Sequence, residues 1–354
     1  MVEEVLLAEP RGFCAGVEMA NKAMAWMVRI FEPPVYCYHE IVHNRLVVDR
    51  FERLGVVFVD DVDAVPARAA LMLSAHGSAP DVVAAARQRD RFVVNAVCPL
   101  VTKVHHEAKV RAAKGYTVLY VGHAGHDEAV GTLAVAPTAM RLVEGDDDVA
   151  PALADVADGD RVALLAQTTL ALHDWEGVME RARARFPSLW TATRDDLCFA
   201  TTNRQAALRV VASRSDAVVV IGSANSSNTV ALTKVAADAG CPVVLRVDGP
   251  EELDLARLQG ARVVGVTAGA SAPEDLVRAV IDTLAPERGV TPVFVTEEGE
   301  YFPPPRELRD LLPALDAIGA LAFAGSPEVA AGRGGPLAED RVADASSALA
   351  DLAR

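Results

Sequence analysis

The sequence has few of the features that mark membrane, nucleic-acid-binding or disulfide-stapled proteins. Its 354 residues contain no apolar run near the 18 or so residues that span a bilayer, and aromatic residues make up only 5%. Lysine and arginine number 34 against 49 aspartate and glutamate, and the net charge of −15 repels nucleic acid and anionic membranes. The first four residues carry acids where a secretory or transit peptide needs bases. We therefore expect a cytoplasmic protein without nucleic-acid or membrane partners, whose anionic ligands are held by a local site.

Several common catalytic motifs are also missing. No GxGxxG follows a strand and no GxxxxGK[ST] is present, which excludes the usual dinucleotide and nucleoside triphosphate fingerprints. If the reaction is a reduction, its electrons must then come from another protein. The absence of HExxH and GxSxG argues against a hydrolase.

Cysteine is scarce, and its five positions are scattered. An odd number of cysteines in a chain expected inside the cell disfavours a disulfide framework. Cys37 and Cys241 occupy strand-like contexts and are expected to be structural. Cys14, Cys98 and Cys198 lie about one hundred residues apart, each in a turn-like junction, and each begins a similar block of strands and helices.

Short runs rich in Val, Leu and Ile, each followed by polar residues and a helical stretch, predict an α/β protein with parallel sheets. We expect three α/β lobes over residues 1–97, 98–195 and 196–284, with Cys98 at a boundary. Residues 285–354 are expected to return to the first lobe. The Ala- and Gly-rich tail from residue 325 predicts partial disorder, with a short helix over 339–352. Other helices are expected over 82–89, 105–114, 175–185, 204–213 and 230–239.

Polar side chains at the strand-to-helix junctions are the candidate site residues, because ligands of open α/β sheets bind beyond the carboxyl ends of the strands. Histidines in short polar loops suit an anion pocket or a proton relay, and Glu128 could donate a proton if it is desolvated. The hydroxyl and amide residues are equally well explained as helix N-caps, although a helix N-terminus also binds phosphate. The candidates for this anion pocket are His43, His76, His123, His126, Ser226, Ser227, Asn228 and Ser271, and Thr168 lies at another of these junctions.

Three distant cysteines do not form a local metal knuckle, and a single cysteine is more often a small buried hydrophobe. If the thiolates of Cys14, Cys98 and Cys198 converge, two metal groups suit them. One is zinc with water as its fourth ligand, and the other is a 4Fe-4S cluster in which one iron lacks a protein ligand.

Nine motifs, in order from about residue 6 to about residue 284, resemble the 4-hydroxy-3-methylbut-2-enyl diphosphate reductase family, also called IspH or LytB. They are PRGFCAGV (10–17), HEIVHN (39–44), SAHG (74–77), CPLVTKVH (98–105), GHAGH (122–126), QTTL (167–170), CFATTNRQ (198–205), NSSN (225–228) and GASAP (269–273).

This resemblance implies the last step of the non-mevalonate isoprenoid pathway, in which an allylic alcohol diphosphate is reductively dehydroxylated to isopentenyl and dimethylallyl diphosphates. It implies three lobes around a 4Fe-4S cluster held by Cys14, Cys98 and Cys198, with Glu128 as the proton source and Thr168 ordering the substrate hydroxyl. It also implies a ferredoxin or flavodoxin as electron donor. The implied diphosphate cradle consists of His43, His76, His126, Ser226, Ser227, Asn228 and Ser271.

The sequence also departs from the family pattern. Asn95-Ala96-Val97 stands where the family usually has Asp-Ala-Thr, Asp127 replaces a proline before Glu128, and 130–135 lacks the usual Glu-Gly-Thr-Met-Gly-Gln. Such changes can shift the cluster potential and the pKa of Glu128. A cluster-binding sensor without turnover, or a paralogue with another substrate, is therefore the alternative function.

An acidic electron donor needs a basic docking face on this acidic chain. The two candidate faces are Lys103, Lys109, Arg111 and Lys114 on one expected helix, and Arg181, Arg183 and Arg185 on another. Ordinary solvated helix faces would look the same.

Overall fold

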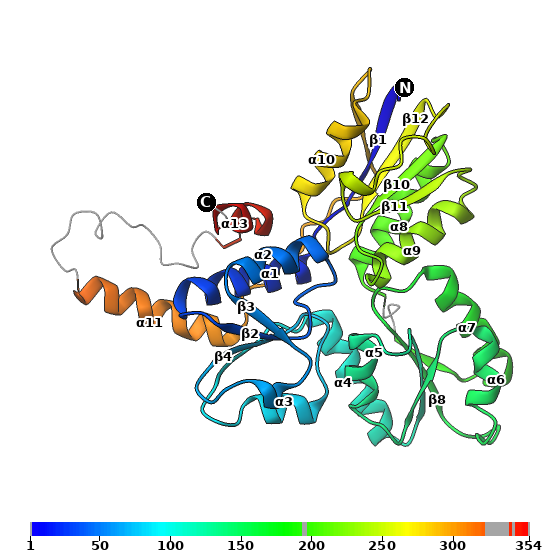
Figure 1. Cartoon of the computed structure of the whole chain (residues 1–354). Helices are drawn as coiled ribbons and strands as arrows, with labels where there is room; N and C mark the ends of the chain where they lie inside the picture. Colours follow the sequence, from blue (N-terminus) through cyan, green and yellow to red (C-terminus); the bar gives the residue numbers. More distant parts are fainter. Residues whose placement is uncertain (1, 193–196, 323–339, 342–343, 353–354) are drawn as a thin grey trace.

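The computed structural model describes residues 2–192, 197–322, 340–341 and 344–352, and it contains three separate parallel sheets (Figure 1). The first sheet has the order β3 (Val56–Val59), β2 (Val35–Tyr38), β4 (Ala70–Leu73), β5 (Phe92–Asn95). The second has the order β7 (Met140–Val143), β6 (Thr117–Val121), β8 (Val162–Ala166), β9 (Trp190–Thr191). The third has the order β11 (Val244–Val247), β10 (Ala217–Ile221), β12 (Val263–Ala268), β1 (Glu4–Glu9), β13 (Val290–Phe294). The predicted α/β class with three parallel-sheet lobes is confirmed.

The helices connect and cover these sheets. In chain order they are α1 (Ala15–Ile30), α2 (Arg45–Arg53), α3 (Pro80–Ala86), α4 (Pro99–Ala113), α5 (Asp127–Leu133), α6 (Val149–Ala152), α7 (Leu172–Arg185), α8 (Phe199–Ala212), α9 (Ser227–Asp238), α10 (Glu274–Leu284), α11 (Arg306–Ala322) and α13 (Ala345–Leu352). Short 3₁₀ turns lie at Val62–Ala64, Asp146–Asp148 and Pro250–Glu252. In the described part of the chain, no helix is long and apolar enough to cross a membrane.

The N-terminal strand does not belong to the lobe predicted for it. β1 pairs with β12 on one side and β13 on the other, so it lies inside the third sheet. The reason is burial: Val5 and Leu7 belong to the core on one face of this sheet, and Leu6 packs under α8 on the other. A strand that is apolar on both faces must have both faces covered, and the interior of the third sheet provides this cover. The prediction of a first lobe over residues 1–97 is therefore wrong for β1.

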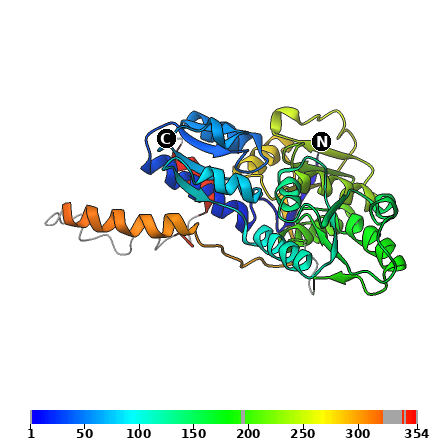
Figure 2. The ribbon, with the colours of Figure 1, turned by 90° about the horizontal axis from the view of Figure 1, so that it is seen from below.

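The C-terminal segment also divides between two lobes. β13 completes the edge of the third sheet, so the third lobe extends beyond the predicted limit at residue 284. The chain then crosses to the first lobe, where Leu308 and Leu312 of α11 and Leu349 of α13 are buried in its core. Figure 2 shows the far end of α11 projecting from the body of the molecule. The disorder predicted from residue 325 falls on 325–339, which lie outside the described residues. The helix predicted over 339–352 corresponds to α13, which starts later, at Ala345.

The expected helices are present, but they begin earlier than predicted. α4 starts at Pro99 rather than at residue 105, and α8 starts at Phe199 rather than at residue 204. Their first turns carry polar residues such as Thr102 and Asn203, which break the apolar period that marks a helix. These first turns directly follow Cys98 and Cys198. The polar residues that interrupt the helical pattern in the sequence therefore lie next to the candidate cluster ligands.

Candidate active site

The structure brings the predicted site residues, except His123, to one cavity between the lobes. His123 lies behind this lining, with its Nδ1 atom 3.3 Å from Ser227 Oγ. The cavity encloses about 700 Å³ of atom-free space, part of which is open to solvent. It is lined by Cys14, His43, His76, Cys98, His126, Glu128, Thr168, Cys198, Ser226, Ser227, Asn228 and Ser271. These residues come from all three sheets, so the cavity depends on the arrangement of the lobes.

Each of the three cysteines in the cavity is the N-cap residue of a helix. Cys14 precedes α1, Cys98 precedes α4 and Cys198 precedes α8. The partial positive charges of three helix N-termini therefore meet at one place, which favours bound anions and thiolates. Pro99 at the first position of α4 suits this role, because proline has no N–H to leave unpaired there.

The backbone ties each cysteine to a loop that carries another site residue. The amide of Cys14 donates to the carbonyl of Ala270 at 3.2 Å, and that of Cys98 donates to Ala75 at 3.0 Å. Ala270 and Ala75 precede Ser271 and His76 in the sequence. The amide of Cys198 donates to Thr168 itself at 3.0 Å. The thiols and the candidate cradle are thus held in one hydrogen-bonded frame.

Burial makes the thiols of Cys98 and Cys198 hard to ionise without a cation. Burial, with the neighbouring Cys14, raises the pKa of Cys98 to about 12, although amide hydrogen bonds from Leu100 and Val101 oppose the shift. Burial and the neighbouring Cys14 and Cys98 also raise the pKa of Cys198, again against backbone hydrogen bonds. Three thiolates can share this cavity only if a positively charged group compensates them, as a bound metal does.

The space beside the sulfurs is kept open by a glycine. A Cβ atom at Gly16 would lie 2.8 Å from Cys98 Sγ and 3.9 Å from Cys14 Sγ, so both sulfur atoms lie within 4 Å of one point. Thiolate ligands, converging helix N-termini and this open space fit a metal group that is held by sulfur.

Glu128 is the buried acid of the cavity. Its side chain is only 2% exposed and accepts hydrogen bonds from the amide of Thr168 at 2.8 Å and from Thr168 Oγ1 at 3.0 Å. Burial raises the pKa of Glu128 from 4.5 to about 7 even though both hydrogen bonds favour the ionised form. A carboxyl that titrates near neutral pH can hold a proton and give it up.

Three histidines form one wall of the cavity. The rings of His43 and His76 stack with centroids 4.0 Å apart, and His126 meets each of them edge-on. Burial and the neighbouring histidines lower the pKa of His126 to about 4 and hold the pKa of His76 well below its usual range. The Nδ1 atom of His126 accepts from the amide of Glu128. These two rings are therefore neutral at pH 7 and offer N–H donors rather than full charges.

Asp127 places a carboxylate in this histidine wall. Its Oδ1 atom lies 2.6 Å from His39 Nδ1, and its Oδ2 atom lies 3.8 Å from both His43 Nε2 and His76 Nδ1. Although burial opposes it, the hydrogen bond from His39 lowers the pKa of Asp127, and the same bond raises the pKa of His39. The replacement noted in the sequence thus adds a negative charge inside the predicted diphosphate cradle.

His43, His76 and Asp127 also form a set of potential metal ligands whose atoms lie within 4.8 Å of one another. The rings of the two histidines are stacked, however, so they do not direct their nitrogens at one point.

The serine and asparagine loops carry structural contacts of their own. Ser226 Oγ caps α9 by accepting from the amide of Thr229, and Asn228 Oδ1 accepts from the amide of Ala270. Ser271 donates to the carbonyl of His43. Asn228 Nδ2 is buried without a partner among the described residues. The N-cap interpretation is therefore correct for Ser226, and it leaves polar atoms available to a ligand.

Sequence reasoning missed the residues that orient this wall. His39 and Glu40 lie in the HEIVHN segment, but no role was assigned to either. His39 holds Asp127, and Glu40 Oε2 lies 3.0 Å from Nδ1 of His43. The spacing of Glu40 and His43, three residues apart, was the available signal. Asn225 joins the same carboxylate, with its Nδ2 atom donating to Glu40 Oε2 at 2.9 Å.

Comparison with known proteins identifies the family of the chain. A family model described as LytB protein matches residues 5–285. The chain belongs to the LytB family. Proteins named 4-hydroxy-3-methylbut-2-enyl diphosphate reductase from Mycobacterium ulcerans and Rhodopirellula baltica are 47% and 45% identical to it. Each alignment covers 86% of this chain, with 92% and 96% of the respective relative.

Solved structures agree with this membership. The Plasmodium falciparum structure of E-1-hydroxy-2-methyl-but-2-enyl-4-diphosphate reductase matches with a TM-score of 0.85 and 28% identity, over 89% of this chain and all of that chain. A second structure, described as (E)-4-hydroxy-3-methyl-but-2-enyl diphosphate reductase, matches with a TM-score of 0.58 and 29% identity over 80% of this chain and 99% of that one. The resemblance seen in the motifs is confirmed.

One departure of this LytB-family chain has a clear structural account. Asn95 Oδ1 accepts from the amide of Val97 at 3.2 Å and so shapes the turn before Cys98. An amide oxygen makes this contact as well as a carboxylate oxygen does. The loss of the aspartate therefore removes a charge near the cavity but leaves the turn intact.

Proposed function

We propose that this chain reduces 4-hydroxy-3-methylbut-2-enyl diphosphate to isopentenyl and dimethylallyl diphosphates, the last step of the non-mevalonate pathway. The observation that carries the proposal is the convergence of three helix-capping cysteines, a buried carboxyl and a histidine wall on one cavity. Family membership and relatives that bear this reductase name support the same activity.

The reaction adds two electrons and two protons, breaks the C–O bond of the allylic alcohol, releases water and forms a C–H bond. Cys14, Cys98 and Cys198 would hold a 4Fe-4S cluster, which supplies electrons and a Lewis-acidic iron when it is bound. The protein's own contribution is to bind the diphosphate, exclude bulk water and hold a proton.

Glu128 supplies the proton at its carboxyl oxygens. A pKa of about 7 keeps a large fraction of this group protonated at neutral pH, whereas an exposed glutamate would be almost fully ionised. The Thr168 hydroxyl, 3.0 Å from Glu128 Oε2, orients the carboxyl and is placed to order the substrate hydroxyl.

The diphosphate is proposed to bind along the histidine wall of the cavity and the start of α9. N–H groups of His43, His76 and His126 donate to it, as do the hydroxyls and amides at the start of α9 and beside Ser271. Ser226, Ser227 and Asn228 open α9, so the helix N-terminus adds its own amides. This arrangement binds an anion without a lysine or arginine, which suits a chain of net charge −15.

The direct test is an anaerobic assay with the diphosphate substrate and a chemical reductant. We expect a brown, iron-containing protein that forms both products, and a Glu128→Gln variant that keeps its iron but loses turnover. A reconstituted protein that binds iron and forms no product would instead support the sensor function. A colourless zinc protein would contradict both.

We further propose that an acidic ferredoxin or flavodoxin delivers the electrons at α4. On the two candidate faces, Arg111 is engaged by Glu107 and by the Trp190 ring, and Arg185 donates to the carbonyls of Leu153 and Val156. Other exposed bases are Lys109 on α4, Lys114 at its C-cap, and Arg181 and Arg183 on α7. Because Cys98 caps the N-terminus of α4, the face of this helix is the better route to the cluster.

Charge reversal separates the two faces. The Lys109→Glu, Lys114→Glu double variant should raise the KM for a protein donor and leave the rate with a chemical reductant unchanged. The matched Arg181→Glu, Arg183→Glu variant should leave both rates unchanged. Equal donor-dependent rates for wild type and the α4 variant would contradict docking at α4.

The expected cytoplasmic location stays a prediction.

A further inference from the structure

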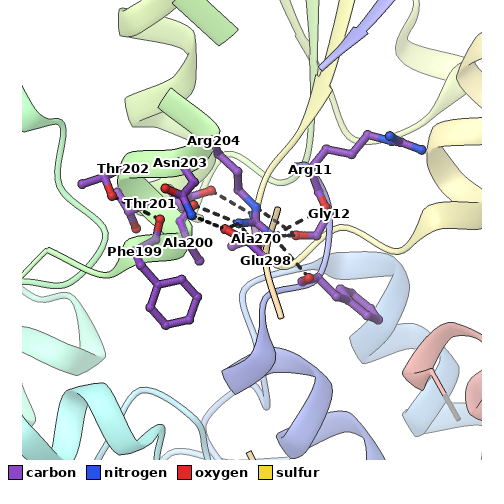
Figure 3. Close-up of polar contacts among 12 residues, drawn as sticks. Arg11, Gly12, Phe199, Ala200, Thr201, Thr202, Asn203, Arg204, Ala270 and Glu298 are labelled. Carbon is purple, nitrogen blue, oxygen red and sulfur yellow. Dashed lines mark hydrogen bonds and ion pairs between the residues drawn. The ribbon is translucent and has the colours of Figure 1, made fainter. Parts of the chain in front are cut away.

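Arg204 carries the most deeply buried charge next to the cavity. It lies in α8, six residues after Cys198, and is only 1% exposed. It belongs to the CFATTNRQ segment, but neither the sequence reasoning nor the proposed reaction gives it a role. Figure 3 shows its guanidinium surrounded by backbone carbonyls from two parts of the chain and by the carboxylate of Glu298.

The carbonyl partners flank two of the three cysteines. Nε and Nη2 of Arg204 donate to the carbonyl of Gly12 at 3.1 and 2.8 Å, and Nη2 also donates to Phe13 at 3.3 Å. Nη1 donates to the carbonyl of Ala200 at 2.9 Å. Gly12 and Phe13 directly precede Cys14, and Ala200 follows Cys198 by two residues. One side chain therefore links the loop of Cys14 to the helix that Cys198 caps.

The loop before Cys14 needs this support. Gly12 has a φ of +64°, a left-handed conformation that glycine adopts readily, and its amide donates to Ala268 at 3.3 Å. The amides thus face the third sheet while the carbonyls face Arg204. Several carbonyls that point at one place repel each other unless a multidentate donor such as a guanidinium lies between them.

Glu298 compensates the buried charge. Both of its carboxylate oxygens lie 3.0 Å from Nη1 of Arg204, and Asn203 Nδ2 donates to Oε1 at 3.0 Å. Glu298 lies in the segment after β13, so the network also attaches the C-terminal part of the chain to the cavity. A buried guanidinium without such a partner is strongly destabilising.

We infer that Arg204 is a positioning residue that holds Cys14 and Cys198 in place for the metal cluster, and that Glu298 sets the net charge of this network. The inference rests on the proposed cluster but not on turnover: an inactive protein that retains its cluster would contradict the proposed function and leave this inference intact.

The main test compares Arg204→Lys with Arg209→Lys in the anaerobic holoenzyme. Lysine keeps the charge but cannot bridge three carbonyls, whereas Arg209 is an exposed residue of the same helix. We expect iron release to a chelator to become at least tenfold faster in Arg204→Lys and to stay within twofold of wild type in Arg209→Lys. Equal release from both variants would overturn the inference. The inference would also be overturned if the metal-free Arg204→Lys protein melts at a lower temperature than wild type and this loss of stability accounts for the faster iron release.

A second variant distinguishes the charge of Glu298 from the positioning role of Arg204. Glu298→Gln keeps an acceptor for Arg204 and removes the compensating charge, so the reduction potential of the cluster should become more positive while iron release stays within twofold of wild type. An unchanged potential would overturn the role assigned to Glu298.

Hydrogen exchange of the wild-type protein provides a readout that needs no variant to fold. If Arg204 holds the loop, the amides of Gly12 and Cys14 should be protected in the metal-free chain as well as in the holoenzyme. Free exchange of both amides in the metal-free chain would show that the cluster orders the loop, and would overturn the inference.

Discussion

At the scale of single residues, chemistry in this cavity depends on charges that are kept out of water. Glu128 has two hydrogen-bond donors that favour its ionised form, yet burial dominates and its pKa rises to about 7. Asp127, one residue earlier, stays ionised because His39 holds it. The pKa values of these adjacent carboxyls are thus shifted in opposite directions by their different surroundings.

Replacement of Glu128 by glutamine should lower the rate of product formation at least about 100-fold, the usual contribution of a general acid. The iron content should stay at the wild-type level. In the wild type, kcat should fall as the pH rises through about 7, because the carboxyl loses the proton that it donates. A pH-independent kcat between 6 and 8 would contradict this assignment.

The same pKa shift predicts how stability depends on pH. Between about 4.5 and 7 the folded protein keeps a proton on Glu128 that the unfolded chain releases. The free energy of unfolding should therefore fall as the pH rises through this window, by at most about 1.4 kcal/mol per pH unit from this group. Glu128→Gln should remove that part of the slope in denaturant titrations of the metal-free protein.

Removal of the Asp127 charge should strengthen diphosphate binding. The carboxylate lies 3.8 Å from two histidine nitrogens that are proposed to bind the same anion. Asp127→Asn should lower the KM for the diphosphate by about tenfold, which corresponds to about 1.4 kcal/mol, with a smaller change in kcat. A raised KM would show instead that the carboxylate is needed to orient the histidines.

At the scale of elements, the helices α1, α4 and α8 direct their N-termini to the cavity, and each begins at a cysteine. The cysteine junctions could be recognised from sequence because Gly16 and Pro99 mark turns. The helix starts could not, because their first turns face the cavity and lack an apolar period.

Gly16 in α1 provides a test at this scale. Alanine usually stabilises a helix by about 0.5–1 kcal/mol relative to glycine, and Gly177→Ala in α7 should show this gain because its Cβ meets only an atom 3.9 Å away. Gly16→Ala would place a Cβ 2.8 Å from Cys98 Sγ. We expect it to lower the iron content while the metal-free protein melts no earlier than wild type. Full iron loading of Gly16→Ala would show that the space is not needed.

At the scale of the whole molecule, the two ends of the chain hold lobes together. β1 is an inner strand of the third sheet and leads directly to Cys14 and α1, which packs in the first lobe. At the other end, α13 lies against α1, where Glu18 accepts from the amide of Ala345 and Lys22 donates to the carbonyl of Asp340.

Leu349 tests the contribution of α13. It is 1% exposed in the first-lobe core, so Leu349→Ala should cost about 2–4 kcal/mol of stability. Leu315→Ala in α11, where the side chain is 38% exposed, should cost much less. Chemical denaturation of both variants gives the comparison. Equal losses would mean that α13 does not contribute to this core.

The sequence alone determined the parallel α/β class, the family and the residue types of the cavity, because buried parallel strands are continuous apolar runs and junction residues follow them along the chain. Only the tertiary structure decided that β1 and β13 complete the third sheet, that Asp127 pairs with His39, and that Arg204 spans from α8 to the loop before Cys14. These partners are far apart in sequence, and neither apolar period nor motif spacing carries information about which distant groups meet. Burial, which gives Glu128 its pKa, is likewise a property of the assembled lobes.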